Sequence, residues 1–284
     1  MENLQKKRAG KLKRLRWRPL LLAIAVVMII GIGLVVTRQT SQPPDGRDPS
    51  KEESLKEWNE EANREQPPEH NNQVQSLAQQ YKGVLFYKGN DTKKQTALTF
   101  DDGPDNVYTP RILDILRAKG VKATFFIVGV QARAHPDVLK RIVDEGHAIG
   151  NHSWDHPRLP SLSSAQVIEE VQSTAAEIER ITGKRSDLFR PPYGLMTARE
   201  MDELKSLGYR VIDWSVDTTD WKGESDKKIL ALVNKEISPG GIILQHCMAG
   251  RPGELEGTVK ALPQIIDRLR AKGYQFVTVP TLLE

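Results

Sequence analysis

From about residue 81 onward, the sequence predicts an α/β fold built on a parallel sheet. Short β-branched or aromatic runs alternate there with amphipathic segments that end in glycine, which is the pattern of strands and crossover helices. Six or seven such units in one domain favour a (β/α) barrel over a doubly wound sheet. An apolar run at 20–36 predicts one membrane-spanning helix ahead of this domain.

The individual elements follow from their end signals. Thr109 and Pro110 are expected to be an N-cap and a first helical residue, and Gly120 is expected to follow the end of that helix. Leu262-Pro263 marks a point at which the last helix could split or kink. The expected strands are 97–100, 123–128, 148–150, 209–215, 242–245 and 275–279, and the expected helices are 109–120, 136–146, 163–183, 197–208, 225–237 and 258–273.

The formal net charge of +4 has two separate sources. Eight of the 41 Lys and Arg residues and only one acid lie within residues 1–18, which carry +7, so the remaining chain carries −3. A domain with a net negative charge is not attracted to the phosphate backbone of a nucleic acid, so a nucleic-acid partner is excluded.

The single cysteine, Cys247, excludes an intramolecular disulfide framework. Nothing in the sequence sets an oligomeric state.

The N-terminal residues predict a signal anchor. Residues 1–18 form a basic segment and residues 19–37 an apolar one, whose run of 17 residues spans roughly 25 Å as a helix. No A-x-A-like cleavage site follows the apolar run, which favours an uncleaved anchor over the alternative, a cleaved signal peptide. The positive-inside rule keeps the basic flank in the cytoplasm. We therefore expect a single-pass protein of the cell membrane, in contact with the lipid bilayer, whose folded domain is extracytoplasmic.

A linker is expected between the anchor and the domain. Residues 38–80 contain six apolar side chains and five prolines, too little apolar surface to offset the entropy of ordering. The sequence thus predicts a flexible polar linker at 38–80 and one folded domain at 81–284.

Two adjacent carboxylates lie where the first predicted strand ends. Asp101 and Asp102 precede Gly103-Pro104, and neighbouring side chains near a strand end project in different directions. One acid could hold a cation while the other stays free as a base. The alternative is a solvent-facing turn.

Two histidines, His152 and His156, follow another strand end. Four residues apart on a helix or tight loop, they can converge on one metal ion, although such a pair also occurs by chance. With one carboxylate they would leave positions open for water and substrate, which is how a catalytic metal site is built.

Three further segments are expected on the same face. Arg190 precedes two prolines that stiffen its loop. Asp217, Asp220 and Trp221 offer acids beside an aromatic ring, and His246 ends the strand at 242–245. Cys247 is interpreted as a bystander because no motif supports a nucleophilic thiol.

Taken in order, five motifs resemble those of the polysaccharide deacetylase family, also called carbohydrate esterase family 4 or the NodB homology domain. The resemblance covers about residues 94–284. The motifs are Thr99-Phe100-Asp101-Asp102-Gly103-Pro104, His152-Ser153-x-x-His156, Arg190-Pro191-Pro192-Tyr193-Gly194, Asp217-x-x-Asp220-Trp221 and Leu244-x-His246.

The resemblance implies a distorted (β/α)7 barrel and a divalent metal, most commonly Zn2+ but with Co2+ or another ion as alternatives. Asp102, His152 and His156 would hold the metal. Asp101 would be the general base and His246 the general acid.

The resemblance also implies supporting roles. Arg190 would orient Asp101, and either Asp220 or Asp217 would tune His246. Tyr193 would contribute its backbone amide to an oxyanion hole, while Leu244 and Trp221 would line the acetyl pocket.

The implied activity is hydrolysis of the N-acetyl group of amino sugars. Outward topology favours a cell-wall polysaccharide as substrate, namely peptidoglycan with its N-acetylglucosamine or N-acetylmuramic acid. Chitin-type oligomers and O-acetylated polysaccharides are alternatives. A barrel glycosidase with paired carboxylates would leave both histidines unused, and a catalytically inactive wall-binding scaffold would not need the acid, base and metal positions.

Overall fold

A curled sheet of parallel strands forms the centre of the part that the structure describes, residues 70–251 and 253–284 of a computed structural model. The strands follow one another in the order β1-β6-β5-β4-β3-β2-β8-β7, and β9 pairs with β2. Their bounds are β1 Leu85–Phe86, β2 Gln95–Asp101, β3 Thr124–Ile127, β4 Ala148–Asn151, β5 Leu188–Phe189, β6 Arg210–Ile212, β7 Val216–Asp217, β8 Gly241–His246 and β9 Gln275–Phe276.

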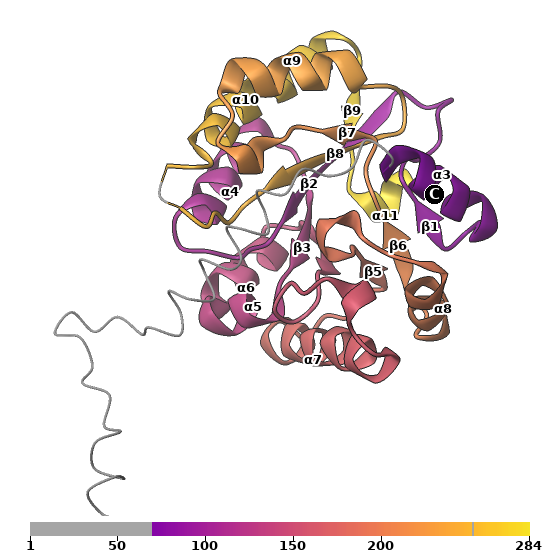
Figure 1. Cartoon of the computed structure of the whole chain (residues 1–284). Coiled ribbons are helices and arrows are strands. Elements are labelled where there is room, and N and C mark those ends of the chain that lie inside the picture. The colour runs from indigo at the N-terminus through magenta and orange to yellow at the C-terminus, as the bar shows by residue number, and fades with distance from the viewer. Residues whose placement is uncertain (1–69, 252) are drawn as a thin grey trace, which may run out of the picture. The chain divides into compact units, whose positions relative to one another are not determined.

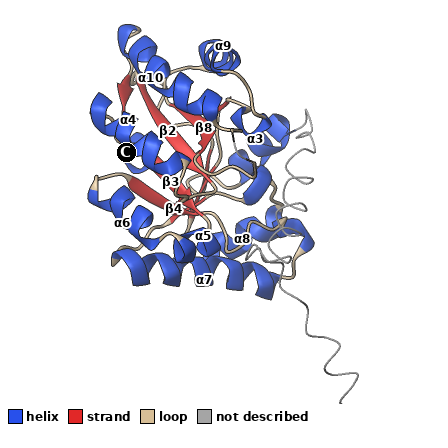
Figure 2. Cartoon of the chain, turned by 90° about the vertical axis from the view of Figure 1, so that its left-hand side faces the viewer, coloured by secondary structure: helices blue, strands red, loops and turns tan. Residues whose placement is uncertain are grey.

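Helices cover the outside of this sheet (Figures 1 and 2). Glycines in the left-handed conformation end α4 at Gly120 and α7 at Gly183, and a capping box at Ser163 begins α7. Such caps satisfy the orphan backbone groups of helix ends. The helices are α3 His70–Gln80, α4 Tyr108–Lys119, α5 Gly129–Ala134, α6 Pro136–Asp144, α7 Ser164–Thr182, α8 Ala198–Ser206, α9 Asp226–Glu236, α10 Glu256–Ala271 and α11 Val279–Leu282.

The core has two sides because side chains alternate along each strand. In β8, Ile242 and Leu244 belong to the cluster inside the curl, whereas Ile243 packs in the cluster shared with the outer helices. In β2, Ala97 faces inward, and Leu98 and Phe100 face the helices. The same alternation turns Asp101 and His246 toward the inside of the curl.

The predicted parallel α/β architecture is confirmed in its coarser form, as a curled half-barrel. Within the described residues, the end strands β1 and β7 are not paired with each other. The sequence missed β1 and β5 because each has only two residues. The predicted strand 209–215 is divided between β6 and the turn before β7, and 275–279 contains β9 and the start of α11. Pro263 lies inside α10 without splitting it.

One helix lies within the range that the sequence assigned to a flexible linker. In α3, Val74 is buried, and Leu77 and Ala78 pack against the cluster around Tyr81 and Leu85. That part of the linker prediction is corrected, since a few well-spaced apolar residues suffice for a helix that docks on an existing core. The anchor predicted at 19–37 lies outside the described residues. Among the helices of the described part, none is both long and apolar enough to cross a membrane.

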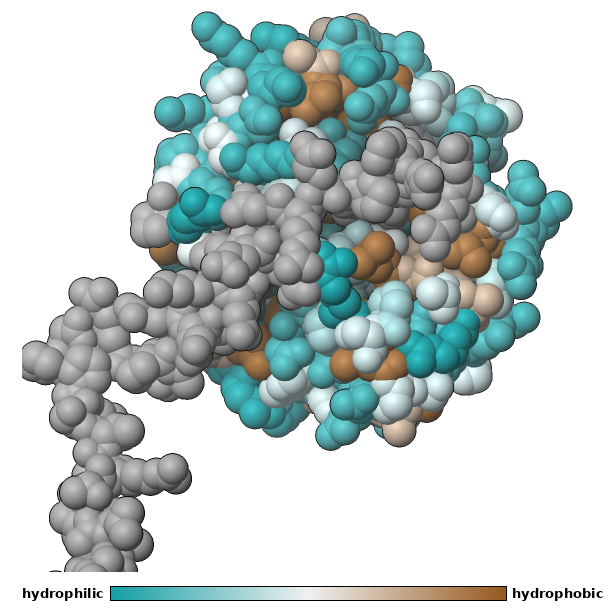
Figure 3. Space-filling view, viewed as in Figure 1, coloured by the Kyte–Doolittle hydropathy of each residue, from teal (hydrophilic) through white to brown (hydrophobic). Residues whose placement is uncertain are grey.

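The described surface is largely hydrophilic on the face drawn in Figure 3, where apolar side chains occur in separate small areas. Val107 is the exposed large hydrophobic residue of the described part, at 58%. It lies three residues after Pro104, at the end of the sheet where Asp101 and Asp102 are found.

A buried amide in β8 predicts a gain in stability. Gln245 is fully buried on the side of the sheet that faces the helices, and neither its amide oxygen nor its nitrogen bonds to a described group. An unpaired buried polar group costs about 1–3 kcal/mol, so Gln245→Met, which conserves length, should raise the free energy of unfolding by about 1 kcal/mol.

Urea unfolding of the two proteins measures this difference. Gln264→Met serves as the control, because Gln264 donates to the Lys260 carbonyl oxygen at 3.1 Å and its replacement should not stabilise. A loss of stability in Gln245→Met would contradict the prediction.

Candidate metal and acid–base site

The motif residues gather at the carboxyl ends of the strands, inside the curl. Asp101 ends β2 and His246 ends β8, and the two residues are partners in the parallel register of these neighbouring strands. Their side chains therefore leave adjacent strands on the same side. Parallel strands place their carboxyl ends along one edge, which is where α/β folds build their sites.

Three side chains converge on a possible metal position. Asp102 Oδ1 lies 3.4 Å from His152 Nε2 and 3.3 Å from His156 Nε2. All three side chains are buried, and one ligand atom from each lies within 4.8 Å of the others. Ligands at the usual 2.0–2.1 Å from a tetrahedral zinc are about 3.3 Å apart, so the separations to Asp102 fit a metal of that kind.

The protonation states of this cluster also suit a metal. Burial lowers the pKa of His156 to about 3, although Asp102 opposes the shift. Burial acts to raise the pKa of Asp102, but His156, His152 and His246 together hold it well below its usual range. A neutral imidazole beside an ionised carboxylate is the state in which both groups bind a cation.

His152 is oriented by the backbone of Arg190. Its Nδ1 lies 2.7 Å from the Arg190 carbonyl oxygen. Since a carbonyl can only accept, Nδ1 carries the proton and Nε2 keeps its lone pair for the ligand position.

The guanidinium of Arg190 is fully buried and holds Asp101. Nη1 donates to Asp101 Oδ1 at 2.8 Å and to Thr99 Oγ1 at 2.7 Å. Nε and Nη2 donate to the carbonyl oxygens of Ile212 and Asp213 at 3.1 and 3.2 Å. Asp101 thus has one carboxylate oxygen bound to the guanidinium, while Oδ2 lies 3.8 Å from His152 Nε2.

His246 is paired with Asp220, not with Asp217. Its Nδ1 lies 2.7 Å from Asp220 Oδ1, and its backbone N–H donates to Oδ2 at 3.0 Å. Burial acts to lower the pKa of His246, but Asp220 raises it to about 10. The Asp217 carboxylate instead accepts the backbone N–H of Thr219 at 2.8 Å.

Tyr193, Leu244 and Trp221 lie around these groups with different exposure. The ring of Tyr193 packs edge-on against His156 with centroids 4.5 Å apart. Leu244 is buried inside the curl, two residues before His246. Trp221 is half-buried in the short turn Asp220–Lys222 that also carries Asp220, and Lys222 lies over its ring.

Sequence patterns did not reveal every residue that holds this site. Thr258, in the first turn of α10, donates its hydroxyl to Asp220 Oδ2 at 2.8 Å. Thr99 donates to the Ile243 carbonyl oxygen while accepting from Arg190. Thr99 lies in the first motif, but no local pattern distinguishes Thr258.

Cys247 packs against the backbone of the segment that carries Asp101 and Asp102. Its thiol is buried 3.3 Å from the Asp101 carbonyl oxygen, and a side chain at Gly103 would overlap its sulfur. Burial raises the pKa of this thiol well above its usual value, which leaves it protonated and unsuited to act as a nucleophile.

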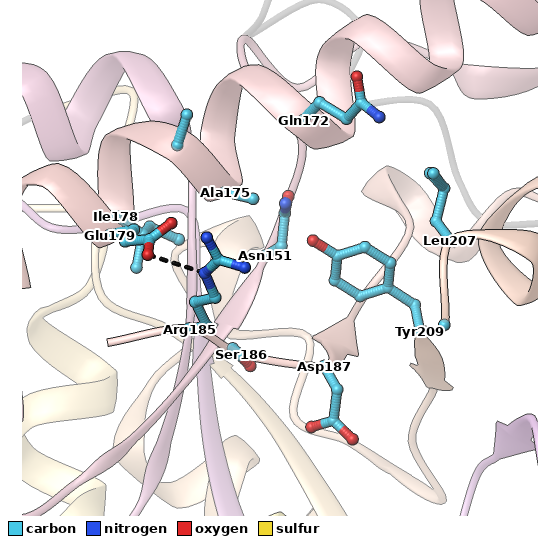
Figure 4. A pocket seen from close by; sticks show the side chains of 12 residues that line it. Asn151, Gln172, Ala175, Ile178, Glu179, Arg185, Ser186, Asp187, Leu207 and Tyr209 are labelled. Atoms are coloured by element: carbon cyan, nitrogen blue, oxygen red, sulfur yellow. Dashed lines mark hydrogen bonds and ion pairs between the residues drawn. The ribbon is translucent and has the colours of Figure 1, made fainter. Parts of the chain in front are cut away.

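A separate cavity of about 700 Å³ lies on the outer side of the sheet. Figure 4 shows it between α7 and the segments before β5 and β6, with Tyr209 and Asn151 on its wall and the Glu179–Arg185 ion pair at one end. None of the metal, acid or base candidates lines it. The chemistry of the side chains therefore locates the site elsewhere than this cavity.

Comparisons with known proteins agree on one family. The polysaccharide deacetylase model matches residues 88–212. The chain is 41% identical over 203 residues to a peptidoglycan-N-acetylglucosamine deacetylase of Bacillus cereus, covering 72% of this chain and 73% of that protein. It is 38% identical to the peptidoglycan-N-acetylmuramic acid deacetylase PdaA of Bacillus subtilis, covering 77% and 81%.

A solved structure adds a contrasting relative. The crystal structure of a carbohydrate esterase family 4 pseudoenzyme from Bacillus anthracis has a TM-score of 0.67 and 33% identity, and the match covers 72% of this chain and 71% of that one.

The His246–Asp220 pair predicts how the stability of the metal-free protein depends on pH. A histidine whose pKa is about 10 when folded and roughly 6.5 when unfolded contributes stability that is complete below pH 6.5. That contribution is lost as pH rises through 10. Between pH 7 and 10, the wild type should therefore lose at least about 1 kcal/mol more than Asp220→Asn.

Urea unfolding at several pH values measures both curves. Asp217→Asn is the matched control and should keep most of the wild-type slope, because Asp217 makes no hydrogen bond to His246 and acts on it only through space. Parallel curves for the wild type and Asp220→Asn would contradict the assigned pairing.

Proposed function

The chain belongs to the polysaccharide deacetylase family, and we propose that it is a metal-dependent hydrolase that removes N-acetyl groups from amino sugars of cell-wall peptidoglycan. One observation carries this proposal. The cluster of Asp102, His152 and His156 lies at the same strand ends as a carboxylate held by Arg190 and a histidinium held by Asp220. A metal site, a base and an acid are the three parts of a metal-assisted amide hydrolysis.

Asp102, His152 and His156 would hold the metal, and zinc fits this donor set of two nitrogens and one oxygen best. Co2+ or another divalent ion is the alternative. When bound, the cation supplies Lewis-acid chemistry toward the acetyl carbonyl and toward water.

Asp101 is proposed as the general base. Its Oδ1 is bound to Arg190, which fixes the direction of the carboxylate and leaves Oδ2 for a proton taken from water. A fixed orientation matters because a proton is transferred efficiently only within hydrogen-bonding distance.

His246 is proposed as the general acid. Its high pKa keeps it protonated near neutral pH, and its free Nε2–H can deliver a proton to the sugar nitrogen as the C–N bond breaks. An amine leaves readily only when protonated, and an acid whose environment differs from that of the base can supply this proton.

Tyr193, Leu244 and Trp221 are proposed to surround the acetyl group. The backbone N–H of Tyr193 would donate to the oxygen that becomes negative in the tetrahedral intermediate. Leu244 supplies an apolar wall, and the half-buried Trp221 offers a ring face to the sugar.

The sugar is the finer part of the proposal. Relatives that match this chain closely are named for N-acetylglucosamine or for N-acetylmuramic acid, and we favour N-acetylglucosamine. Chitin-type oligomers and O-acetylated polysaccharides are alternatives that the same groups could hydrolyse.

An inactive scaffold is the second candidate function, because one relative of similar fold is named a pseudoenzyme. The presence of Asp101, His246 and all three metal-binding candidates in one site favours catalysis in this chain.

We also propose that residues 19–37 anchor the protein in the cell membrane, with the catalytic domain outside the cytoplasm. The basic residues before the apolar run support this orientation, and a substrate in the cell wall requires it.

Removal of the metal or of the base should stop the reaction for different reasons. Chelator-treated protein should release no acetate from peptidoglycan fragments until a divalent metal is returned. Asp101→Asn should lower kcat/KM about 10²–10⁴-fold while metal content stays unchanged, because Asp101 lies outside the proposed ligand set.

Mass spectrometry of the glycan products measures the activity as a loss of about 42 Da per sugar, which is one acetyl replaced by hydrogen. Asp91→Asn, whose side chain is 68% exposed, is the control. Full activity in the presence of chelator would exclude this mechanism, and full activity of Asp101→Asn would exclude the assigned base.

The anchor predicts where the protein is found. The full-length chain should sediment with membranes and withstand a high-salt wash, whereas a chain without residues 1–37 should be soluble. Mature protein that begins after residue 37 in the medium would instead indicate a cleaved signal peptide.

A further inference from the structure

The loop that carries His152 and His156 has an unfavourable backbone conformation at two residues. Within residues 151–156, Ser153 and His156 both have φ of 65°, a left-handed conformation that side chains with a Cβ rarely adopt. Such a conformation persists only where the surroundings enforce it. The loop must therefore be held by contacts other than its own conformational preference.

Part of this support is local to the loop and its strand. Asn151 accepts the backbone N–H of Ser153 on Oδ1 at 2.9 Å and donates from Nδ2 to the Val171 carbonyl oxygen. Ser153 Oγ accepts the N–H of His156 at 3.1 Å. The N–H of His152 donates to the Ile127 carbonyl oxygen at 2.9 Å. These bonds fix both ends of the loop.

The middle of the loop is held from outside, by helix α7. One carboxylate oxygen of Glu170, Oε2, accepts the backbone N–H of Trp154 at 2.7 Å and that of Asp155 at 3.3 Å. These two residues lie between the two histidines. A carboxylate is the acceptor best suited to bind two N–H groups at once, because charge strengthens both bonds.

The carbonyl groups of the same segment are bound by a second helix, α5. The first N–H groups of α5 donate to it, from Gly129 to Ser153 at 3.0 Å and from Val130 to Trp154 at 2.9 Å. A side chain at Gly129 would overlap the Trp154 ring, so the glycine permits this close approach. The loop is thus clamped between α5 and α7, which lie side by side (Figure 1).

We propose that Glu170 is a positioning residue for the metal site. By binding the backbone of Trp154 and Asp155, it holds His152 and His156 in the arrangement in which both Nε2 atoms face Asp102. Glu170 does not bind the metal itself, because its carboxylate faces the backbone of the loop. This inference rests on the proposed metal site and adds the residue that keeps it formed before the metal arrives.

The location of Glu170 on α7 fits this role. The inward face of the helix is otherwise apolar near this point, with Val167 and Val171 fully buried. An acid beside such a face is unfavourable unless it is bound. Thr174, one turn later, donates its hydroxyl to the Glu170 carbonyl oxygen and is itself buried.

The test is the affinity of the metal-free, full-length protein for Zn2+ alone, measured by competition with a chromophoric chelator. Glu170→Ala should bind Zn2+ about 10–100-fold more weakly, which is the usual effect of losing an outer hydrogen bond that orients a ligand. Glu170→Gln keeps an acceptor oxygen without the charge and should recover most of this loss.

Glu169 provides matched controls, because it is the preceding residue on the same helix and is exposed. Glu169→Ala and Glu169→Gln should bind Zn2+ as the wild type does. The absorption spectrum of the Co2+-loaded protein gives a second readout, since its intensity reports ligand geometry. It should change in Glu170→Ala and not in Glu169→Ala.

Equal Zn2+ affinity and equal Co2+ spectra for the Glu170 and Glu169 variants would overturn the inference, even if Glu170→Ala were less stable. Should Glu170→Ala fail to fold, a Glu170→Gln protein that binds Zn2+ a few-fold more weakly than Glu169→Gln supports it, and identical binding overturns it. If the wild type itself does not bind Zn2+, the proposed metal site is wrong instead.

Discussion

The buried guanidinium of Arg190 is the interaction on which the rest of the site depends. A charge removed from water must be paired and hydrogen-bonded. Arg190 meets that requirement by donating to two side chains of β2 and to two carbonyl oxygens at and just after the end of β6. Its side chain orients Asp101, and its own carbonyl oxygen fixes the tautomer of His152. The guanidinium also lies over the ring of Phe126, 4.1 Å from its centroid. One residue thereby couples the proposed base to a proposed metal ligand, so neither can move independently of the sheet.

A second constraint is backbone strain, which is concentrated at the motifs. The residues other than glycine that have positive φ in the described part are Asp102, Ser153, His156, Tyr193 and Thr219. Each lies in, or between the defining residues of, one of the five motifs. Such conformations are unfavourable in isolation, and a rigid surrounding structure must hold them. Here the parallel strands and the helices behind them supply that rigidity, which explains why these segments occur at strand ends and not in free loops.

The sequence predicted the central strands because they are long and apolar, and it predicted the site because parallel strands bring their carboxyl ends together. Asp101, His152 and His246 could be grouped on that basis alone, whereas Arg190 follows β5, a strand that the sequence missed. Short strands such as β1 and β5 carry too few residues for a pattern. The partner of His246 also could not be chosen from spacing, because Asp217 and Asp220 differ only in where a turn directs them. The contacts of Thr258 and Glu170 come from helices distant in sequence, and no local periodicity marks such pairs.

The charge states of the site depend on which histidine each carboxylate faces. Asp102 faces His152 and His156, the other two candidate metal ligands. Burial keeps the imidazole of His156 neutral. Asp220 faces His246 alone, and there the same kind of burial is outweighed, so that this imidazole keeps its proton. His156 is buried and His246 is only 13% exposed. What separates their pKa values is the neighbouring acid and how many imidazoles share it. Histidine can therefore serve both as a metal ligand and as a general acid within one site. This requires that separate hydrogen-bond donors fix the carboxylate beside each imidazole.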